Sequence, residues 1–222
     1  MKPCISNRKT AALTRVEVLV VVSIVAVLIL IFLKKTESDI RTGRLESAEI
    51  NCVNNLKQIG LAYRVWEENH GDKYPMQTSV TNGGTMELAN GKNAWINFSV
   101  MSNELSTPKV LICPADMDKI AATNFTTDFN NSKISYFVGL NAIDNYPQTL
   151  LSGDDNFEIS GVPAKSGLLE LSTDAPISWA AARHKFYGNL GMADGSVQQA
   201  TSSYLRQSVQ QTGIATNRLA IP

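Results

Sequence analysis

The first clear pattern in the sequence is an apolar run from Val16 to Leu33. Of its 18 residues, only Glu17 and Ser23 are polar. A helix of that length extends about 27 Å, close to the hydrocarbon thickness of a bilayer. The run has no polar face, which argues against a buried helix of a soluble domain. It ends in a pair of lysines without a small-residue cleavage site, so it predicts a retained membrane span rather than a cleaved secretory signal.

A second pattern follows, in which apolar residues recur at steps of three and four with polar residues between them. This spacing places them on one face of a helix. No proline occurs from Leu13 to His70, and Gly71 is a plausible helix stop. The sequence therefore predicts one continuous helix over 13–70, first in lipid and then against a folded domain. The apolar face comprises Leu45, Ala48, Cys52, Leu56, Ile59, Tyr63 and Trp66.

The remainder, 71–222, is rich in Asn, Ser, Thr and Gly, with short apolar runs between turn signals. Strands are predicted over 110–113, 134–138, 166–171 and 190–193, loops over 123–131 and 145–160, and a short helix over 203–211. Asp194-Gly195 predicts a two-residue hairpin turn of type I′. The fold class that follows is α+β, with a long N-terminal helix packed on an antiparallel β-sheet.

The charges add an orientation for the span. Basic residues and no acidic ones precede Glu17, so the positive-inside rule favours a cytoplasmic N-terminus and an outer C-terminal region. The formal net charge of the whole chain is zero, which gives no sign of a nucleic-acid-binding surface.

The three cysteines divide between the two sides of the predicted span. Cys4 precedes it, and Cys52 and Cys113 follow it, on the side where disulfides persist. Two alternatives stay open for the second pair. They form a disulfide, or they are separate buried thiols that pack as small apolar side chains.

The N-terminal sequence resembles that of type IV pilin-like proteins, which include the pseudopilins of type II secretion. The resemblance rests on a short basic leader, the junction Ala12-Leu13, and a glutamate, Glu17, at the fifth position after that junction. Three positions depart from the usual pattern: Ala12 replaces glycine, Leu13 replaces phenylalanine, and Arg15 replaces an apolar residue. The resemblance implies a leader over 1–12 removed by prepilin peptidase, N-methylation at Leu13, a transmembrane and filament-core helix over 13–33, an amphipathic stem over 34–70 and an extracytoplasmic α+β region over 71–222.

Further motifs resemble one subgroup of this family. They are the stem sequence from Cys52 to Gly60, with Asn54, Asn55, Leu56, Lys57 and Gln58; Cys113-Pro114-Ala-Asp116; and His184 separated by nine residues from Asp194-Gly195. The function implied is that of a structural subunit in a bacterial type IV pilus-like or type II secretion filament. Its implied partners are prepilin peptidase, other pilin-like subunits and inner-membrane lipid, with the C-terminal region in the periplasm.

Glu17 has a physical role that fits this resemblance. A carboxylate in hydrocarbon costs several kcal/mol unless it is paired or protonated. The cationic amine of Leu13 in a neighbouring subunit would supply that pair in the assembled register. The alternative is a carboxylate that reaches the interface beside Arg15.

Two other functions are alternatives for this sequence. A membrane-anchored ligand- or glycan-binding protein would use aromatic stacking platforms, for which the candidates are Trp66, Trp95, Trp179 and Tyr136; core packing is the commoner role of such residues. A hydrolase built on His184, Asp194 and Ser196 is rejected, because Ser196 lacks the sequence signature of an activated nucleophile.

The sequence predicts no cofactor and no enzyme activity. No CxxC motif and no closely spaced histidine pair is present. Asp154, Asp155 and Glu158 can offer oxygen ligands to Ca²⁺. A solvated acidic loop is the favoured interpretation of these three residues.

Overall fold

The computed structural model describes residues 14–88, 93–181 and 183–222. The chain forms two compact units, Met1–Leu45 and Glu46–Pro222. Helix α1, Arg15–Glu68, belongs to both. The predicted helix is therefore confirmed over almost its whole length, although Leu13 lies outside the described residues. The second unit includes the latter part of the predicted stem, because the apolar stripe of that part is buried in the core.

The N-terminal part of α1 is the apolar segment. Arg15–Glu37 is long and apolar enough to cross a membrane, and none of it is buried within the chain. A membrane anchor and a signal sequence share this composition. Nothing in the structure explains the position of Arg15.

The second unit contains short helices besides the C-terminal part of α1. They are α2, Ala94–Ser99; α3, Ser102–Leu105; and α4, Ser202–Gln211. The 3₁₀ turns are η1, Pro75–Gln77; η2, Val80–Asn82; η3, Pro108–Leu111; and η4, Asn131–Lys133. Helix α4 confirms the prediction over 203–211, and its N-cap is Thr201, whose side chain accepts from the Tyr204 N–H.

The strands form two antiparallel sheets. The six-stranded sheet has the order β5-β9-β1-β2-β7-β8, and the three-stranded sheet has the order β4-β3-β6. Together with α1 they confirm the α+β class. The bounds in the larger sheet are β1 Tyr136–Gly139, β2 Leu150–Asp154, β5 Gly167–Ser172, β7 Tyr187–Met192, β8 Val197–Thr201 and β9 Thr216–Ile221. Those in the smaller are β3 Phe157–Ile159, β4 Val162–Pro163 and β6 Ile177–Trp179.

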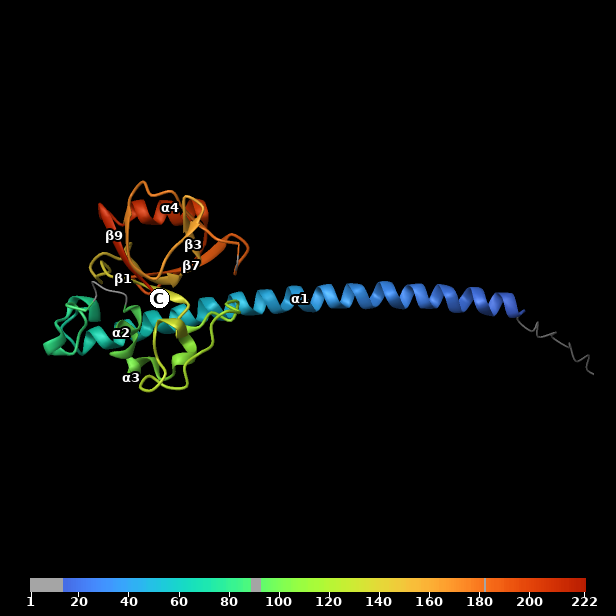
Figure 1. Cartoon of the computed structure of the whole chain (residues 1–222), viewed down its shortest axis with the longest axis horizontal. Helices are drawn as coiled ribbons and strands as arrows, with labels where there is room; N and C mark the ends of the chain where they lie inside the picture. The colour runs from blue at the N-terminus through green and yellow to red at the C-terminus, as the bar shows by residue number, and fades with distance from the viewer. Residues whose placement is uncertain (1–13, 89–92, 182) are drawn as a thin grey trace, which may run out of the picture. The chain divides into compact units, whose positions relative to one another are not determined.

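The larger sheet separates two apolar cores. In β1, Tyr136 and Val138 belong to the core that includes the stripe of α1, and Phe137 belongs to the other. This division follows from the two-residue period of a strand, which sends successive side chains to opposite faces. Within this unit, α2 and α3 lie on the α1 side of the sheet and α4 lies on the opposite side (Figure 1). Both faces are covered, which is why all of β1 and β2 is buried.

Two predictions along this region are wrong. The sequence over 110–113 was expected to be a strand, but it follows Pro108 into the 3₁₀ turn η3, where Thr107 accepts from the Lys109 N–H. A proline at the start of a helical turn loses no hydrogen bond, so the turn is favoured over pairing in a sheet. The loop expected over 145–160 contains β2 and β3. Gly153 and Asp154 resemble turn residues in the sequence, yet both are buried within β2.

The hairpin of β7 and β8 is present, but its turn differs from the predicted type. Type I′ needs positive φ at both central residues, and only Gly195 of the pair has one, at 80°. The Gly195 N–H donates to the Met192 carbonyl, and the Met192 N–H donates to the Ser196 carbonyl. The loop therefore has three residues, with glycine in the left-handed position that such loops favour.

Candidate functional site

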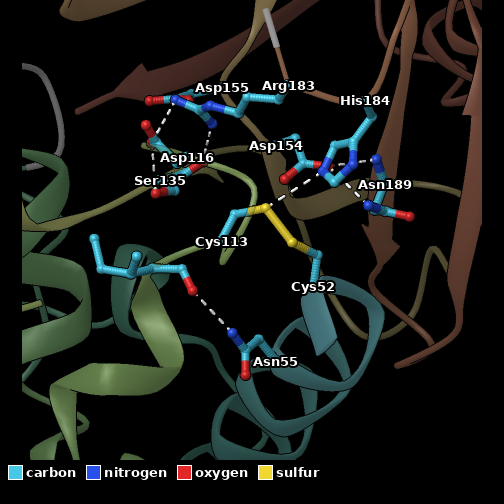
Figure 2. The surroundings of a disulfide bond; sticks show 11 residues. Cys52, Asn55, Cys113, Asp116, Ser135, Asp154, Asp155, Arg183, His184 and Asn189 are labelled. Atoms are coloured by element: carbon cyan, nitrogen blue, oxygen red, sulfur yellow. Dashed lines mark hydrogen bonds and ion pairs between the residues drawn. A yellow bond between two sulfur atoms is a disulfide. The ribbon is translucent and has the colours of Figure 1, made fainter. Parts of the chain in front are cut away.

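A disulfide joins α1 to the segment that follows η3. Cys52 and Cys113 are both fully buried, and their Cα atoms are 5.1 Å apart (Figure 2). The sequence left open whether these cysteines pair, and the structure joins them. One turn along α1, the Asn55 Nδ2 donates to the Ile112 carbonyl at 2.9 Å. The stem motif and the Cys113-Pro114 motif are thus connected by a covalent bond and a hydrogen bond at the same place.

His184 lies against this disulfide. Its Nε2 is 3.3 Å from the Cys113 Sγ and 3.5 Å from the Asp154 Oδ2. The imidazole reaches this position from a tight turn, which the Tyr187 N–H closes by donating to the His184 carbonyl. Lys185 and Phe186 in the turn have φ values of 53° and 69°, a left-handed conformation that costs about 1–2 kcal/mol per residue without glycine. Backbone strain of this kind is commonest at functional sites.

Asp154, at the end of β2, is the fully buried carboxylate of the site. Asn189 of β7 donates to its Oδ2 twice, from the backbone N–H at 2.7 Å and from Nδ2 at 2.9 Å (Figure 2). Its Oδ1 is buried and accepts no hydrogen bond from the described residues. Burial raises the pKa of Asp154 to about 7, against the opposing effect of the Asn189 hydrogen bonds. Burial also disfavours the charged form of His184, and it therefore lowers the pKa of that imidazole.

A network of charges lies beside the site. Arg183 Nη2 is 2.7 Å from the Asp116 Oδ2, and its Nη1 is 2.5 Å from the Asp155 Oδ1 (Figure 2). Lys119 Nζ is 2.7 Å from the Asp155 Oδ2. The Ser135 hydroxyl donates to Asp116 at 2.7 Å, and the Ser135 carbonyl accepts from Arg183. Two acidic and two basic side chains balance each other in this network.

The network changes the interpretation of the acidic residues near 154. They are not a solvated loop: Asp154 ends β2, and Glu158 is on β3. Asp155 lies between them and is paired with two cationic side chains. The three carboxylates therefore have separate environments, rather than the shared one that was expected.

A second contact joins the motifs further along α1. A Cβ added to Gly60 would lie 3.5 Å from the Gly195 Cα, so the β7–β8 turn packs directly on the helix at this glycine. The Ala193 carbonyl of the same turn accepts from the Tyr74 hydroxyl at 2.8 Å and from the Arg64 Nη2 at 3.4 Å. Arg64 also pairs with Asp144 at 2.9 Å. The turn that contains the Asp194-Gly195 motif therefore packs against α1.

His184 and Asp194 have different contacts. His184 meets the disulfide and Asp154, whereas the Asp194 Oδ1 accepts the Ser196 N–H at 2.8 Å on the exposed surface of the turn. The described contacts do not join the two residues into an acid–base pair. Strand β7 lies between them in the sequence.

Glu67, which also lies beside Arg64, makes the stability of the protein depend on pH. Burial, together with the nearby Asp144 carboxylate, raises the pKa of Glu67 to about 7, while Arg64 opposes the shift. The pKa of Glu67 is therefore higher in the folded protein than in the unfolded chain. The contribution of protonated Glu67 to stability is full below about pH 4.5, and it is lost as the pH rises towards 7. We expect Glu67→Gln to gain stability relative to the wild type over that interval, as measured by urea denaturation at a series of pH values. Glu68→Gln, at an exposed position, is the matched control; a constant difference between Glu67→Gln and the wild type at all pH values would contradict the prediction.

No protein-family model, curated protein or solved structure matches this chain. The site is therefore interpreted from its own geometry. That geometry brings together Cys52, Cys113 and His184 from three different motifs, and it adds Asp154 and Asn189, which the sequence did not single out as a pair.

The other residues of the motifs have simpler positions. Leu56 is buried in the core, whereas Asn54, Lys57 and Gln58 are exposed on α1 and Pro114 is exposed after Cys113. Ala12 and Leu13, the residues of the predicted peptidase site, lie outside the described residues.

Glu17 has a local role that sequence reasoning missed. The Thr14 N–H and hydroxyl both donate to the Glu17 Oε2, at 2.7 and 2.9 Å, and the Glu17 N–H donates back to the Thr14 hydroxyl at 3.3 Å. This is a capping box at the start of α1, and its sequence signal is a threonine followed three residues later by a glutamate. Among the described residues, the Glu17 Oε1 accepts no hydrogen bond.

The aromatic candidates for ligand stacking belong to the core. Trp66, Trp179 and Tyr136 are at most 2% exposed. Trp95 is partly buried, and it packs edge-to-face on Phe129. A sugar ring needs an exposed aromatic face, which the three buried rings do not offer.

Proposed function

We propose that this protein is a structural subunit of a bacterial type IV pilus-like or type II secretion filament. Prepilin peptidase cuts the chain between Ala12 and Leu13, and the apolar part of α1 anchors the subunit in the inner membrane before assembly. The C-terminal unit is periplasmic. The observation that carries the proposal is an apolar helical segment, Arg15–Glu37, of which none is buried within the chain and which contains a carboxylate near its start. Lipid covers this segment in the free subunit, and neighbouring copies cover it in the filament.

The geometry at Glu17 supports an assembly contact. The capping box uses the Oε2 atom, which leaves the Oε1 atom for a partner from another subunit. Cleavage leaves the Thr14 groups in place and creates a cationic amine at Leu13. That amine in a neighbouring copy removes the cost of a carboxylate in hydrocarbon, and it does so only in the correct register.

The C-terminal unit supports a structural role. Its motifs connect α1 to the segment after η3 through the disulfide and the Asn55 hydrogen bond, and to the β7–β8 turn through the contact of Gly60 with Gly195. These contacts hold the remainder of the C-terminal unit on the part of α1 that belongs to the same unit. The burial of Trp66, Trp179 and Tyr136 disfavours the alternative of an anchored glycan-binding protein.

The experiment compares three chains in a host with an active prepilin peptidase: the wild type, Glu17→Gln and Glu17→Ala. Glutamine keeps the capping box but removes the charge, whereas alanine removes both. We expect both variants to insert in the membrane and to be processed, but to lose at least about 90% of their incorporation into sheared filaments. A loss of about 1.4 kcal/mol in the assembly contact gives this tenfold decrease. N-terminal sequencing of the membrane-extracted chains reports processing.

Two results would contradict the proposal. An N-terminus at Met1 despite an active peptidase would exclude the pilin-like pathway. Normal incorporation of Glu17→Gln, with loss only in Glu17→Ala, would show that Glu17 acts through the cap and not through its charge.

A further inference from the structure

Four side chains with metal-binding atoms meet at the disulfide. Cys52 comes from α1, Cys113 from the segment after η3, Asp154 from the end of β2 and His184 from the turn before β7. One ligand atom from each lies within 4.8 Å of those of the others. Cys52, Cys113 and Asp154 are buried, and the His184 side chain is only 4% exposed. Figure 2 shows the imidazole and the carboxylate facing the sulfur atoms.

We propose that this cluster binds one Zn²⁺ when Cys52 and Cys113 are reduced. Structural zinc sites are four-coordinate and use cysteine sulfur, histidine nitrogen and carboxylate oxygen. The cluster supplies two thiolates, the His184 Nε2 and one oxygen of Asp154. No ligand has to be brought from elsewhere in the chain.

The surroundings of Asp154 point independently to a missing partner. Its Oδ1 is fully buried and has no hydrogen bond from the described residues, which is costly for a carboxylate. Its Oδ2 is held by two hydrogen bonds from Asn189. Such outer contacts orient metal ligands in zinc sites.

The disulfide and the metal are alternatives at the same place. While the sulfur atoms are bonded to each other, neither is a thiolate. A dithiol reductant transfers two electrons and two protons to the disulfide, giving two protein thiols and the oxidised, cyclic disulfide of the reductant. Zn²⁺ binding then releases the two thiol protons, because the ligands are thiolates. The C-terminal unit is thus closed by a disulfide under oxidising conditions and by a metal under reducing ones. This inference does not depend on the filament proposal.

The test uses the full-length chain in detergent, in a Cys4→Ser background so that only the two relevant thiols remain. Reduced chains are obtained by expression under reducing conditions and are kept from air, so the burial of the disulfide does not prevent the experiment. After addition of Zn²⁺ and desalting, we expect one zinc per chain in the reduced protein and none in the oxidised protein. Bound zinc should also protect both thiols from alkylation by a maleimide.

The ligand variants are His184→Ala and Asp154→Asn, and His70→Ala is the matched histidine control. We expect each ligand variant to weaken zinc affinity about 100-fold or more, at least as much as the loss of an outer contact, in competition with a chromophoric chelator. The control should bind as the wild type does. Co²⁺ in place of zinc should give the ligand-field spectrum of a tetrahedral site with two thiolates in the wild type, and a different spectrum in His184→Ala.

The proposal is overturned if the reduced chain binds no zinc. It is also overturned if His184→Ala and Asp154→Asn bind zinc as tightly as the wild type, because the two thiols alone would then be the ligands. Near-UV circular dichroism of the oxidised variants shows whether each is folded. If one ligand variant fails this control, the other, together with the cobalt spectrum of the wild type, decides the result.

Discussion

Replacing Cys52 and Cys113 with alanine is expected to lower the free energy of unfolding of the C-terminal unit by about 4 kcal/mol. The disulfide closes a long loop, with 61 residues of sequence separation, and its removal returns the conformational entropy of that loop to the unfolded chain. Urea denaturation followed by tryptophan fluorescence measures this change, because all three tryptophans lie in Glu46–Pro222.

The measurement is made with a metal chelator present, so that zinc cannot replace the lost bond in the reduced wild type. The reduced wild type should show a decrease similar to that of the double alanine variant. A decrease below about 1 kcal/mol in both would show that the disulfide does not constrain the unfolded state as loop closure requires.

Arg183→Met is expected to destabilise the protein by about 3–5 kcal/mol, the usual cost of removing one partner from a buried ionic network. The substitution leaves Asp116 and Asp155 without their guanidinium, at side-chain exposures of 2% and 7%. Lys119 still pairs with Asp155, so Asp116 carries most of the uncompensated charge. Urea denaturation at neutral pH gives the change in free energy.

Lys109→Met is the matched control, because it removes a positive charge from an exposed position. Surface substitutions of this kind usually stay within about 0.5 kcal/mol. Equal midpoints for the two variants would contradict the importance assigned to the network. A gain in stability on adding Asp116→Asn to Arg183→Met would show that the unpaired carboxylate is the cause.

The helical and antiparallel parts of the fold could be predicted because their signals are local. The absence of proline up to His70 and the three-to-four spacing from Cys52 to Trp66 identify α1 and its buried face. Strand β5 and helix α4 follow from short apolar patterns between turn residues. Each of these elements needs only its own residues to be recognised.

The site could be predicted only in part, because it depends on pairing between distant segments. Cys52, Cys113 and His184 belong to recognisable motifs, but their meeting depends on the path of β1, β2 and β7. Asp154 escaped notice as a core residue because Gly153 and Asp154 are typical of turns. They fit a strand because the sheet is covered on both faces and Asn189 donates two hydrogen bonds to the Asp154 Oδ2. A turn at Asp194-Gly195 is predicted by the sequence, but the same two residues suit both a two-residue and a three-residue loop, and the structure has the latter, with Gly195 packed against Gly60.

Strand β7 gives the nine-residue spacing between His184 and Asp194 a meaning of its own. The strand has six residues, and at about 3.3 Å per residue it spans about 20 Å between the disulfide and the turn on α1. The nine-residue interval therefore sets the distance between the His184 contact at the disulfide and the β7–β8 turn. Adding or removing one residue would reverse the faces of the strand beyond that point, so that His184 and the Asp194-Gly195 turn could no longer both reach their contacts. The nine-residue spacing therefore constrains the length of the segment between His184 and Asp194 more than it constrains the chemical roles of these two residues.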